Sequence, residues 1–179
     1  MSGVSNWLLI DIGNTSIKYA VVDTHTDPEF LEVHQAQNLN ELGDVLASVQ
    51  HVALASVREP ENLSAFIDDL HSQGIPVHIA QTQKIQRIGR VHLQNSYKTP
   101  ENMGVDRWLA MIAGVYFAER ITEHNVLVTD AGTAITCDVV VGHMHKGGFI
   151  APGLQMLKQA KLAVLKCLCW AICTANMQI

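Results

Sequence analysis

The sequence lacks the features that mark secreted, membrane-spanning and nucleic-acid-binding proteins. Its first residues show no positively charged segment followed by a long apolar run and a small-residue cleavage site, so no signal peptide is predicted. Lysine and arginine total 12 against 17 acidic residues, and the net charge of −5 disfavours a nucleic-acid surface. The apolar C-terminal tail is too short, and too interrupted by Lys161 and Lys166, for a membrane span. We therefore expect a cytoplasmic protein that binds neither nucleic acid nor membrane.

Cysteine is also scarce, with four residues in the chain. Cys137 stands alone, whereas Cys167, Cys169 and Cys173 crowd the C-terminal end. This spacing does not distribute disulfides over a fold, so free thiols in a reducing compartment are expected. The three clustered cysteines have neither a CxxC spacing nor a nearby histidine, which disfavours a zinc site.

The chain of 179 residues, 48% of them hydrophobic, has the size and composition of a packed globular protein. Apolar spacing and turn residues predict secondary structure in the first half of the chain. The expected elements, in chain order, are strands at 7–10, 19–22 and 30–33, a helix at 39–50, a strand at 51–57, a helix at 63–74 and a strand at 75–79. A β-meander followed by alternating helices and strands predicts an α/β architecture with a mixed sheet.

The spacing of the histidines does not indicate a metal site. Six of them are scattered without i,i+4 pairing and are interpreted as surface or hydrogen-bonded structural residues: His25, His34, His51, His71, His78 and His92. His143 and His145 would lie on one side of a strand, but glycines and a lysine surround them. A solvated hairpin turn is therefore expected there instead of a metal site.

The stretch Asp-Ile-Gly-Asn-Thr-Ser-Ile-Lys, residues 11–18, lies between two apolar runs and is predicted to connect two strands of a β-hairpin. Such a connection can hold a phosphate group. Gly13 would let the backbone approach a ligand, Thr15 and Ser16 would offer hydroxyl and N–H groups, and Lys18 would balance negative charge. Asp11, at the strand end, could hold Mg²⁺ directly or through water. An ordinary hairpin whose Gly-Asn pair makes the turn explains the same residues.

A second informative stretch spans residues 95–108. Thr99 followed by proline is typical of a helix start, and Gly104 would end that short turn. Asp106 then opens a longer helix, from Arg107 to about Arg120, whose predicted core face is Leu109, Ile112, Ala113 and Tyr116. Asp106 could be a helix cap with Arg107 on the surface. Alternatively, the carboxylate could accept a hydroxyl proton while the guanidinium binds an anionic substrate.

Residues 126–141 repeat the plan of the first hairpin. An apolar strand leads into Asp130-Ala-Gly-Thr133, and a second apolar strand follows. Two Asp-x-Gly hairpins far apart in one chain suggest a duplicated lobe whose halves clamp a nucleotide.

Four motifs in this order resemble those of the type III pantothenate kinases, which belong to the acetate and sugar kinase, actin and heat-shock chaperone superfamily. The motifs are Asp11-Ile-Gly-Asn-Thr15, Gly104-Val-Asp-Arg107, Asp130-Ala-Gly-Thr133 and Gly147-Gly-Phe-Ile-Ala-Pro-Gly153. The resemblance runs from about residue 8 to about residue 159. It implies an α/β fold of the ribonuclease H-like, actin-like ATPase type, with duplicated lobes and mixed β-sheets.

The resemblance also implies roles for individual residues. Asp106 would be the catalytic base. Asp11 would lie near the metal, Asp130 would bind a monovalent cation, and Thr133 would contact ATP. The first phosphate loop would comprise Asp11, Ile12, Gly13, Asn14, Thr15, Ser16, Ile17 and Lys18. The pantothenate contacts would be Tyr97, Gly104, Val105, Asp106 and Arg107.

By this resemblance, the expected reaction transfers the γ-phosphoryl group of ATP to the primary hydroxyl of pantothenate, which gives 4′-phosphopantothenate for coenzyme A synthesis. The implied cofactors are Mg²⁺ and a monovalent cation, K⁺ or NH₄⁺, and the implied assembly is a homodimer. Phosphoryl transfer depends mainly on positioning and charge neutralisation, which suits loops, cations and one carboxylate. The alternative is a catalytically inactive nucleotide-binding or regulatory protein on the same scaffold.

The expected lobes are residues 1–122 and residues 123–179. Family members continue well beyond this length, so the second lobe is expected to be incomplete. The tail at 161–179 does not resemble the family, which suggests a frameshift or truncation, and its apolar surface would favour aggregation if left exposed.

Overall fold

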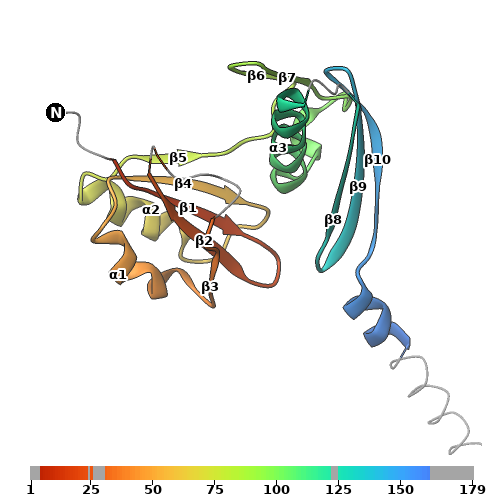
Figure 1. Ribbon diagram of the computed structural model, residues 1–179. Helices are drawn as coiled ribbons and strands as arrows, with labels where there is room; N and C mark the ends of the chain where they lie inside the picture. Colours follow the sequence, from red (N-terminus) through yellow and green to blue (C-terminus); the bar gives the residue numbers. More distant parts are fainter. Residues whose placement is uncertain (1–4, 24, 26–30, 122–124, 162–179) are drawn as a thin grey trace, which may run out of the picture. The chain divides into compact units, whose positions relative to one another are not determined.

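The computed structural model describes residues 5–23, 25, 31–121 and 125–161 (Figure 1). The expectations for the tail and its three cysteines concern residues outside this part of the chain. The described residues divide into two compact units. One comprises the residues up to Gln86 together with Tyr97–Leu109, and the other comprises Arg87–Ser96 together with the residues from Ala110 onward. The lobe boundary at residue 122 stays a prediction.

The first unit contains a five-stranded mixed sheet in the order β3-β2-β1-β4-β5. Its strands are β1 (Trp7–Ile12), β2 (Ile17–Val22), β3 (His34–Ala36), β4 (His51–Ser56) and β5 (Val77–Ile79). The first three strands form an antiparallel meander, whereas β4 runs parallel to β1 and β5 runs parallel to β4. The predicted mixed sheet is therefore confirmed.

Helices cover one face of this sheet. They are η2 (Leu39–Leu42), α1 (Gly43–Leu46) and α2 (Leu63–Ser72). Alternate residues of β1 point toward them because side chains alternate between the faces of a strand. The resulting core includes Leu8, Ile10, Leu54, Leu46 and Leu70, each at most 9% exposed.

Two predicted elements of this unit were misplaced. The third strand was expected at 30–33 but lies at His34–Ala36, where it pairs with β2. Leu31 and Val33 instead line a pocket. The helix expected at 39–50 is split into η2 and the four-residue α1. Asn38 caps η2 through its side chain, and the last backbone N–H groups bond three residues back, as in a tightened turn.

The segment that follows contains β6 (Ile85–Ile88), β7 (Val91–Gln94), η3 (Pro100–Asn102) and α3 (Val105–Arg120). Thr99 occupies the cap position of η3, as expected, although its side chain makes no capping bond. The predicted core face of α3 was wrong, since Leu109 and Tyr116 are exposed. The buried apolar residues of α3 are a different set with helical spacing, namely Val105, Trp108, Met111, Val115 and Ala118.

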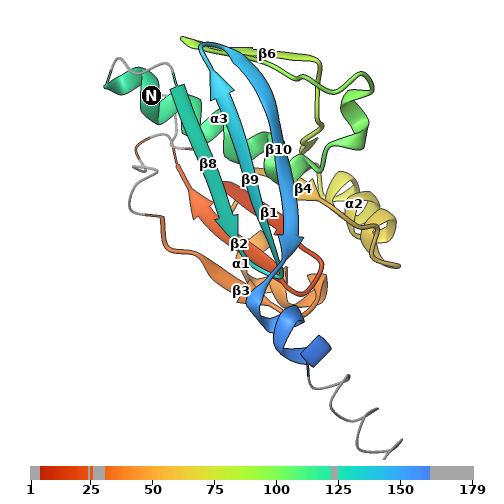
Figure 2. The same ribbon diagram turned by 90° about the vertical axis from the view of Figure 1, so that its right-hand side faces the viewer.

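The second unit contains a five-stranded sheet in the order β6-β7-β10-β9-β8. Its main body is the antiparallel meander of β8 (Asn125–Ala131), β9 (Ala134–Val141) and β10 (Met144–Pro152), which lie side by side in Figure 2. A helix begins at residue 154. No described helix is long and apolar enough to cross a membrane.

The β8-β9-β10 meander repeats the β1-β2-β3 meander of the first unit. In the first sheet, β1 pairs with β2 on one edge and with β4 on the other. Within the described residues, β8 ends its sheet and pairs with β9 alone. The architecture is α/β with two mixed sheets of the ribonuclease H-like type, and the second lobe is incomplete in the part of the chain that the structure describes.

Candidate functional site

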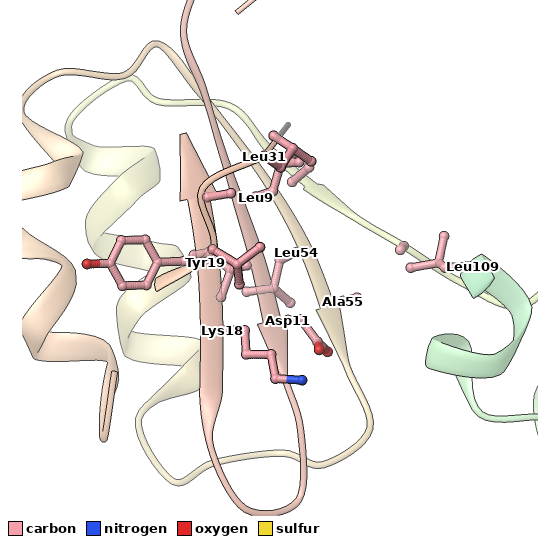
Figure 3. Close-up of a pocket in the computed structure, with 13 residues that line it drawn as sticks. Leu9, Asp11, Lys18, Tyr19, Leu31, Leu54, Ala55 and Leu109 are labelled. Carbon is pink, nitrogen blue, oxygen red and sulfur yellow. The ribbon is translucent and has the colours of Figure 1, made fainter. Parts of the chain in front are cut away.

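The first Asp-x-Gly hairpin has the geometry expected of a ligand-binding loop. Asp11 and Lys18 are partners in the β1–β2 register, so their side chains lie on the same face of the sheet (Figure 3). The four residues between the strands are closed by a hydrogen bond of 3.1 Å from the Gly13 N–H to the Ser16 carbonyl oxygen. A Cβ atom on Gly13 would lie 3.2 Å from that oxygen, so glycine suits this close approach.

A pocket of about 520 Å³ lies beside this hairpin (Figure 3). Its walls are mainly apolar and come largely from β1, β2 and β4. Asp11 and Lys18 are its two charged lining residues among the described part of the chain. An apolar pocket with a few charged groups at one position is the usual form of a small-molecule site.

Arg58 is a residue at this hairpin that sequence reasoning missed. Its Nε atom donates a hydrogen bond of 2.8 Å to the carbonyl oxygen of Gly13, although the two residues are 45 positions apart in the sequence. The available signal was topological: Arg58 follows β4, and the carboxyl ends of adjacent parallel strands meet at one edge of a sheet.

The structure brings Tyr97 and Arg107 together. The Arg107 Nη1 atom lies 3.2 Å from the Tyr97 hydroxyl oxygen, to which it donates a hydrogen bond. The guanidinium carbon lies 6.0 Å from the centre of the tyrosine ring. Arg107 is only 6% exposed, and a buried arginine is normally held by partners of this kind. Lys84 fixes the Tyr97 backbone through a 2.8 Å hydrogen bond to its carbonyl oxygen.

Asp106 lies in the first turn of α3, which begins at Val105, two residues before the predicted start at Arg107. Its side chain is exposed, and its Oδ1 atom accepts a 2.7 Å hydrogen bond from the Arg107 N–H. The N-terminus of a helix favours a carboxylate in its charged form. A Cβ atom on Gly104 would lie 2.5 Å from this Oδ1, so glycine leaves room for the observed carboxylate position.

The second Asp-x-Gly hairpin belongs to the second unit. Asp130 is the penultimate residue of β8, as Asp11 is of β1, and the Gly132 N–H donates to the Ala134 carbonyl oxygen at 2.9 Å. Thr133 is exposed at the tip, and its carbonyl oxygen accepts a 3.0 Å hydrogen bond from the Gly153 N–H. The loop has two residues where the first hairpin has four, so it offers fewer amide groups to a ligand.

His145 corrects the prediction of a solvated turn at residues 143–145. The turn does expose His143, but the His145 side chain is fully buried in β10. Its Nε2 atom lies 3.0 Å from Asp138 Oδ1, and its Nδ1 atom lies 2.9 Å from Ser96 Oγ. Asp138 is itself 2% exposed. The three side chains form a hydrogen-bonded network in the second unit, in which His145 and Asp138 are buried and Ser96 is exposed.

Metal ligation by this site would depend on few protein groups. Within the described residues, no three or more histidine, cysteine, aspartate or glutamate side chains gather as a metal cluster. Mg²⁺ is commonly held by one or two carboxylates together with substrate phosphates and water. Asp11, a single carboxylate at a loop suited to phosphate, fits that kind of binding.

The two sheets and their hairpins identify the fold class of the protein. Two meander sheets, each with an Asp-x-Gly hairpin, are the architecture of the actin-like ATPase fold. A solved structure of a Baf family protein from Campylobacter jejuni shares this fold. It has a TM-score of 0.51 and 23% identity, and the match covers 88% of this chain and 60% of that one.

Within that class, the family model of the type III pantothenate kinases matches residues 7–163, and the chain belongs to this family. The relative from Pseudoalteromonas atlantica is 35% identical over 166 residues, which cover 89% of this chain and 63% of that protein. A relative from a Marinomonas species is 35% identical over 164 residues, covering 91% of this chain and 63% of that protein. Both relatives are named type III pantothenate kinase, and this chain spans less than two thirds of their length.

Proposed function

We propose that this chain serves the ATP-dependent phosphorylation of pantothenate to 4′-phosphopantothenate, the first step of coenzyme A biosynthesis. Membership of the family supports the proposal, and one structural observation carries it. The buried Arg107 guanidinium is held by the Tyr97 hydroxyl, and the preceding residue, Asp106, exposes its carboxylate. Pantothenate carries a carboxylate and a primary hydroxyl, so it presents one group for each of these side chains.

Arg107 is suited to the substrate carboxylate. A guanidinium offers donors in a planar fork that matches a carboxylate, and burial strengthens such a charge-assisted pair because water competes less. The hydrogen bond to the Tyr97 hydroxyl restricts the rotation of the arginine side chain. A pre-oriented side chain loses less conformational entropy when the substrate binds.

Asp106 is suited to accept the proton of the substrate hydroxyl. As the hydroxyl oxygen attacks the γ-phosphorus of ATP, its proton passes to the carboxylate, and the bond from that phosphorus to the bridging oxygen breaks to leave ADP. The 2.7 Å hydrogen bond from the Arg107 N–H fixes one carboxylate oxygen. The other oxygen can then face the substrate.

The first hairpin would hold the phosphate chain. Its loop amides and the hydroxyls of Thr15 and Ser16 are donors, and Lys18 adds a positive charge. Magnesium, when bound, would neutralise the negative charge of the phosphates. Asp11, the penultimate residue of β1, would supply a carboxylate for that ion.

The second hairpin would bind the monovalent cation and part of the nucleotide. Asp130 would contribute a carboxylate to a K⁺ or NH₄⁺ site, and Thr133 would contact ATP. We further propose a homodimer, which the family resemblance implies, and a cytoplasmic location.

Calorimetric titration of pantothenate into the chain tests the role that carries this proposal. The Arg107→Lys variant keeps the charge but loses the fork, so its affinity should fall at least about tenfold. Arg120→Lys, the same change at an exposed position in the last turn of α3, is the matched control and should bind as the wild type does. Wild-type protein that binds no pantothenate, or equal affinities for wild type and Arg107→Lys, would contradict the assignment.

A further inference from the structure

Arg58 lies where two parallel strands of the first sheet end together. Ile12 and Ser56, the last residues of β1 and β4, are partners in the parallel register, and the Val57 N–H donates to the Ile12 carbonyl oxygen at 3.2 Å. In open α/β sheets, ligands bind outside the carboxyl ends of the strands. Arg58 is therefore at the same edge as the first hairpin.

Both the backbone and the side chain of Arg58 are fixed. The Ser56 hydroxyl donates to the Arg58 carbonyl oxygen and lies 3.4 Å from the Arg58 N–H, which donates to it. The Nε atom donates to the Gly13 carbonyl oxygen at 2.8 Å. These contacts join the chain after β4 to the hairpin loop and orient the guanidinium before any ligand arrives.

The donors that remain on Arg58 suit an anion. A guanidinium has five N–H donors, of which Nε carries one and the two Nη groups carry the others. The residue is exposed, so its Nη groups can reach a ligand at the loop. Arginine binds phosphate oxygens through two parallel hydrogen bonds more readily than lysine does.

The charges at the hairpin support the same conclusion. Asp11 and Lys18 are opposite each other in the β1–β2 register, so one acidic and one basic residue flank the loop. Arg58 adds a second basic residue at this edge of the sheet, and the exposed Glu59 follows it in the chain. Two basic side chains together with the backbone N–H groups of the loop suit a chain of phosphates better than a neutral ligand.

We infer that Arg58 binds the phosphate chain of a nucleoside triphosphate at the first hairpin, as a cation additional to Lys18. The inference rests on the proposed function, because the nucleotide is its substrate. The competing explanation is that Arg58 only ties the loop to β4 through the Gly13 carbonyl oxygen.

Calorimetry with ATP, inorganic tripolyphosphate and adenosine separates these explanations. Arg58→Gln should weaken ATP and tripolyphosphate binding about ten- to hundredfold and leave adenosine binding unchanged, because only the phosphates lose a partner. Arg58→Lys keeps the charge without the Nε donor, so its affinity for ATP and tripolyphosphate should fall clearly less than that of Arg58→Gln. Arg90→Gln removes an exposed positive charge from the turn between β6 and β7 and should bind all three ligands as the wild type does.

Each outcome decides the question. If Arg58→Lys and Arg58→Gln lose equal affinity for ATP and tripolyphosphate, and lose affinity for adenosine as well, Arg58 only holds the loop in place. That result would overturn the inference. Unchanged ATP and tripolyphosphate affinity in Arg58→Gln would overturn it while the proposed function stands. Arg58-dependent tripolyphosphate binding without any pantothenate binding would uphold the inference and reject the proposed function. Wild-type protein that binds neither ATP nor tripolyphosphate would reject both.

Discussion

The hydrogen bonds of the buried His145 side chain are expected to stabilise the second unit. Replacing His145 with alanine removes a fully buried ring and its hydrogen bonds to Asp138 and Ser96. A hydrogen bond to a charged group contributes about 1.5–3 kcal/mol, and breaking a buried pair costs about 3–5 kcal/mol because the remaining charge loses its partner. The cavity left by the ring acts in the same direction. We expect the second unit to lose about 3–5 kcal/mol of stability.

His143→Ala is the matched control, since the same substitution is made two residues earlier. His143 is exposed in the turn and stacks on His92 with ring centres 5.2 Å apart. Losing that stack should cost at most about 1 kcal/mol. The two variants differ mainly in the burial of the ring, so their difference measures the network.

Amide hydrogen exchange of β9 and β10 is the appropriate assay because it reports on the second unit separately. The His145→Ala amides should exchange roughly two to three and a half orders of magnitude faster than those of the wild type, since one order corresponds to about 1.4 kcal/mol. The His143→Ala amides should change by less than one order. Equal exchange rates in the two variants would refute the view that the network stabilises this unit.

Two further substitutions test the packing. Gly153→Ala would place a Cβ atom against the carbonyl oxygens of the second hairpin loop, so urea unfolding should show that this variant is less stable than the wild type. Gly43→Ala has open space around its Cβ position, so its stability should not fall. An equal effect of the two changes would contradict the close approach. Leu54→Ala deletes a side chain that is 1% exposed and should cost about 2–5 kcal/mol in the same assay. Val21→Ala, at a position 41% exposed, should cost far less, and similar losses would argue against this core.

Local patterns predicted the two hairpins well. Each Asp-x-Gly lies between apolar runs, so turn chemistry and strand alternation indicate the same structure. β1 and β2 pair as the residues around Asp11 indicated, and β8 and β9 do so around Asp130. The sequence alone therefore predicted that Asp11 and Asp130 lie near the ends of their strands.

Features that depend on distant partners could not be predicted in this way. Leu31 and Val33 have the hydrophobicity of a strand, yet β3 begins at His34, because an edge strand is selected by its pairing with β2. Helix α3 is apolar on more than one face, so periodicity did not distinguish the buried Trp108 face from the exposed Leu109 face.

The polar contacts likewise depend on partners that are far apart in the sequence. His145 is seven residues from Asp138 and 49 from Ser96, and the glycines at 142 and 147 lie close to it in the sequence. Its burial follows from the pairing of β9 with β10, which its local sequence does not encode. Arg58 likewise reaches Gly13 only because β1 and β4 are adjacent.

Formation of 4′-phosphopantothenate from ATP and pantothenate in the presence of Mg²⁺ and K⁺, followed by mass spectrometry, is the decisive assay of the proposed reaction. Asp106→Asn is the matched variant, because the amide keeps an oxygen for the Arg107 N–H but cannot act as the base. We expect the wild type to form product and Asp106→Asn to form it at a rate lower by about 10²- to 10⁴-fold. No product from folded wild-type protein, or equal rates from the two proteins, would contradict the proposal.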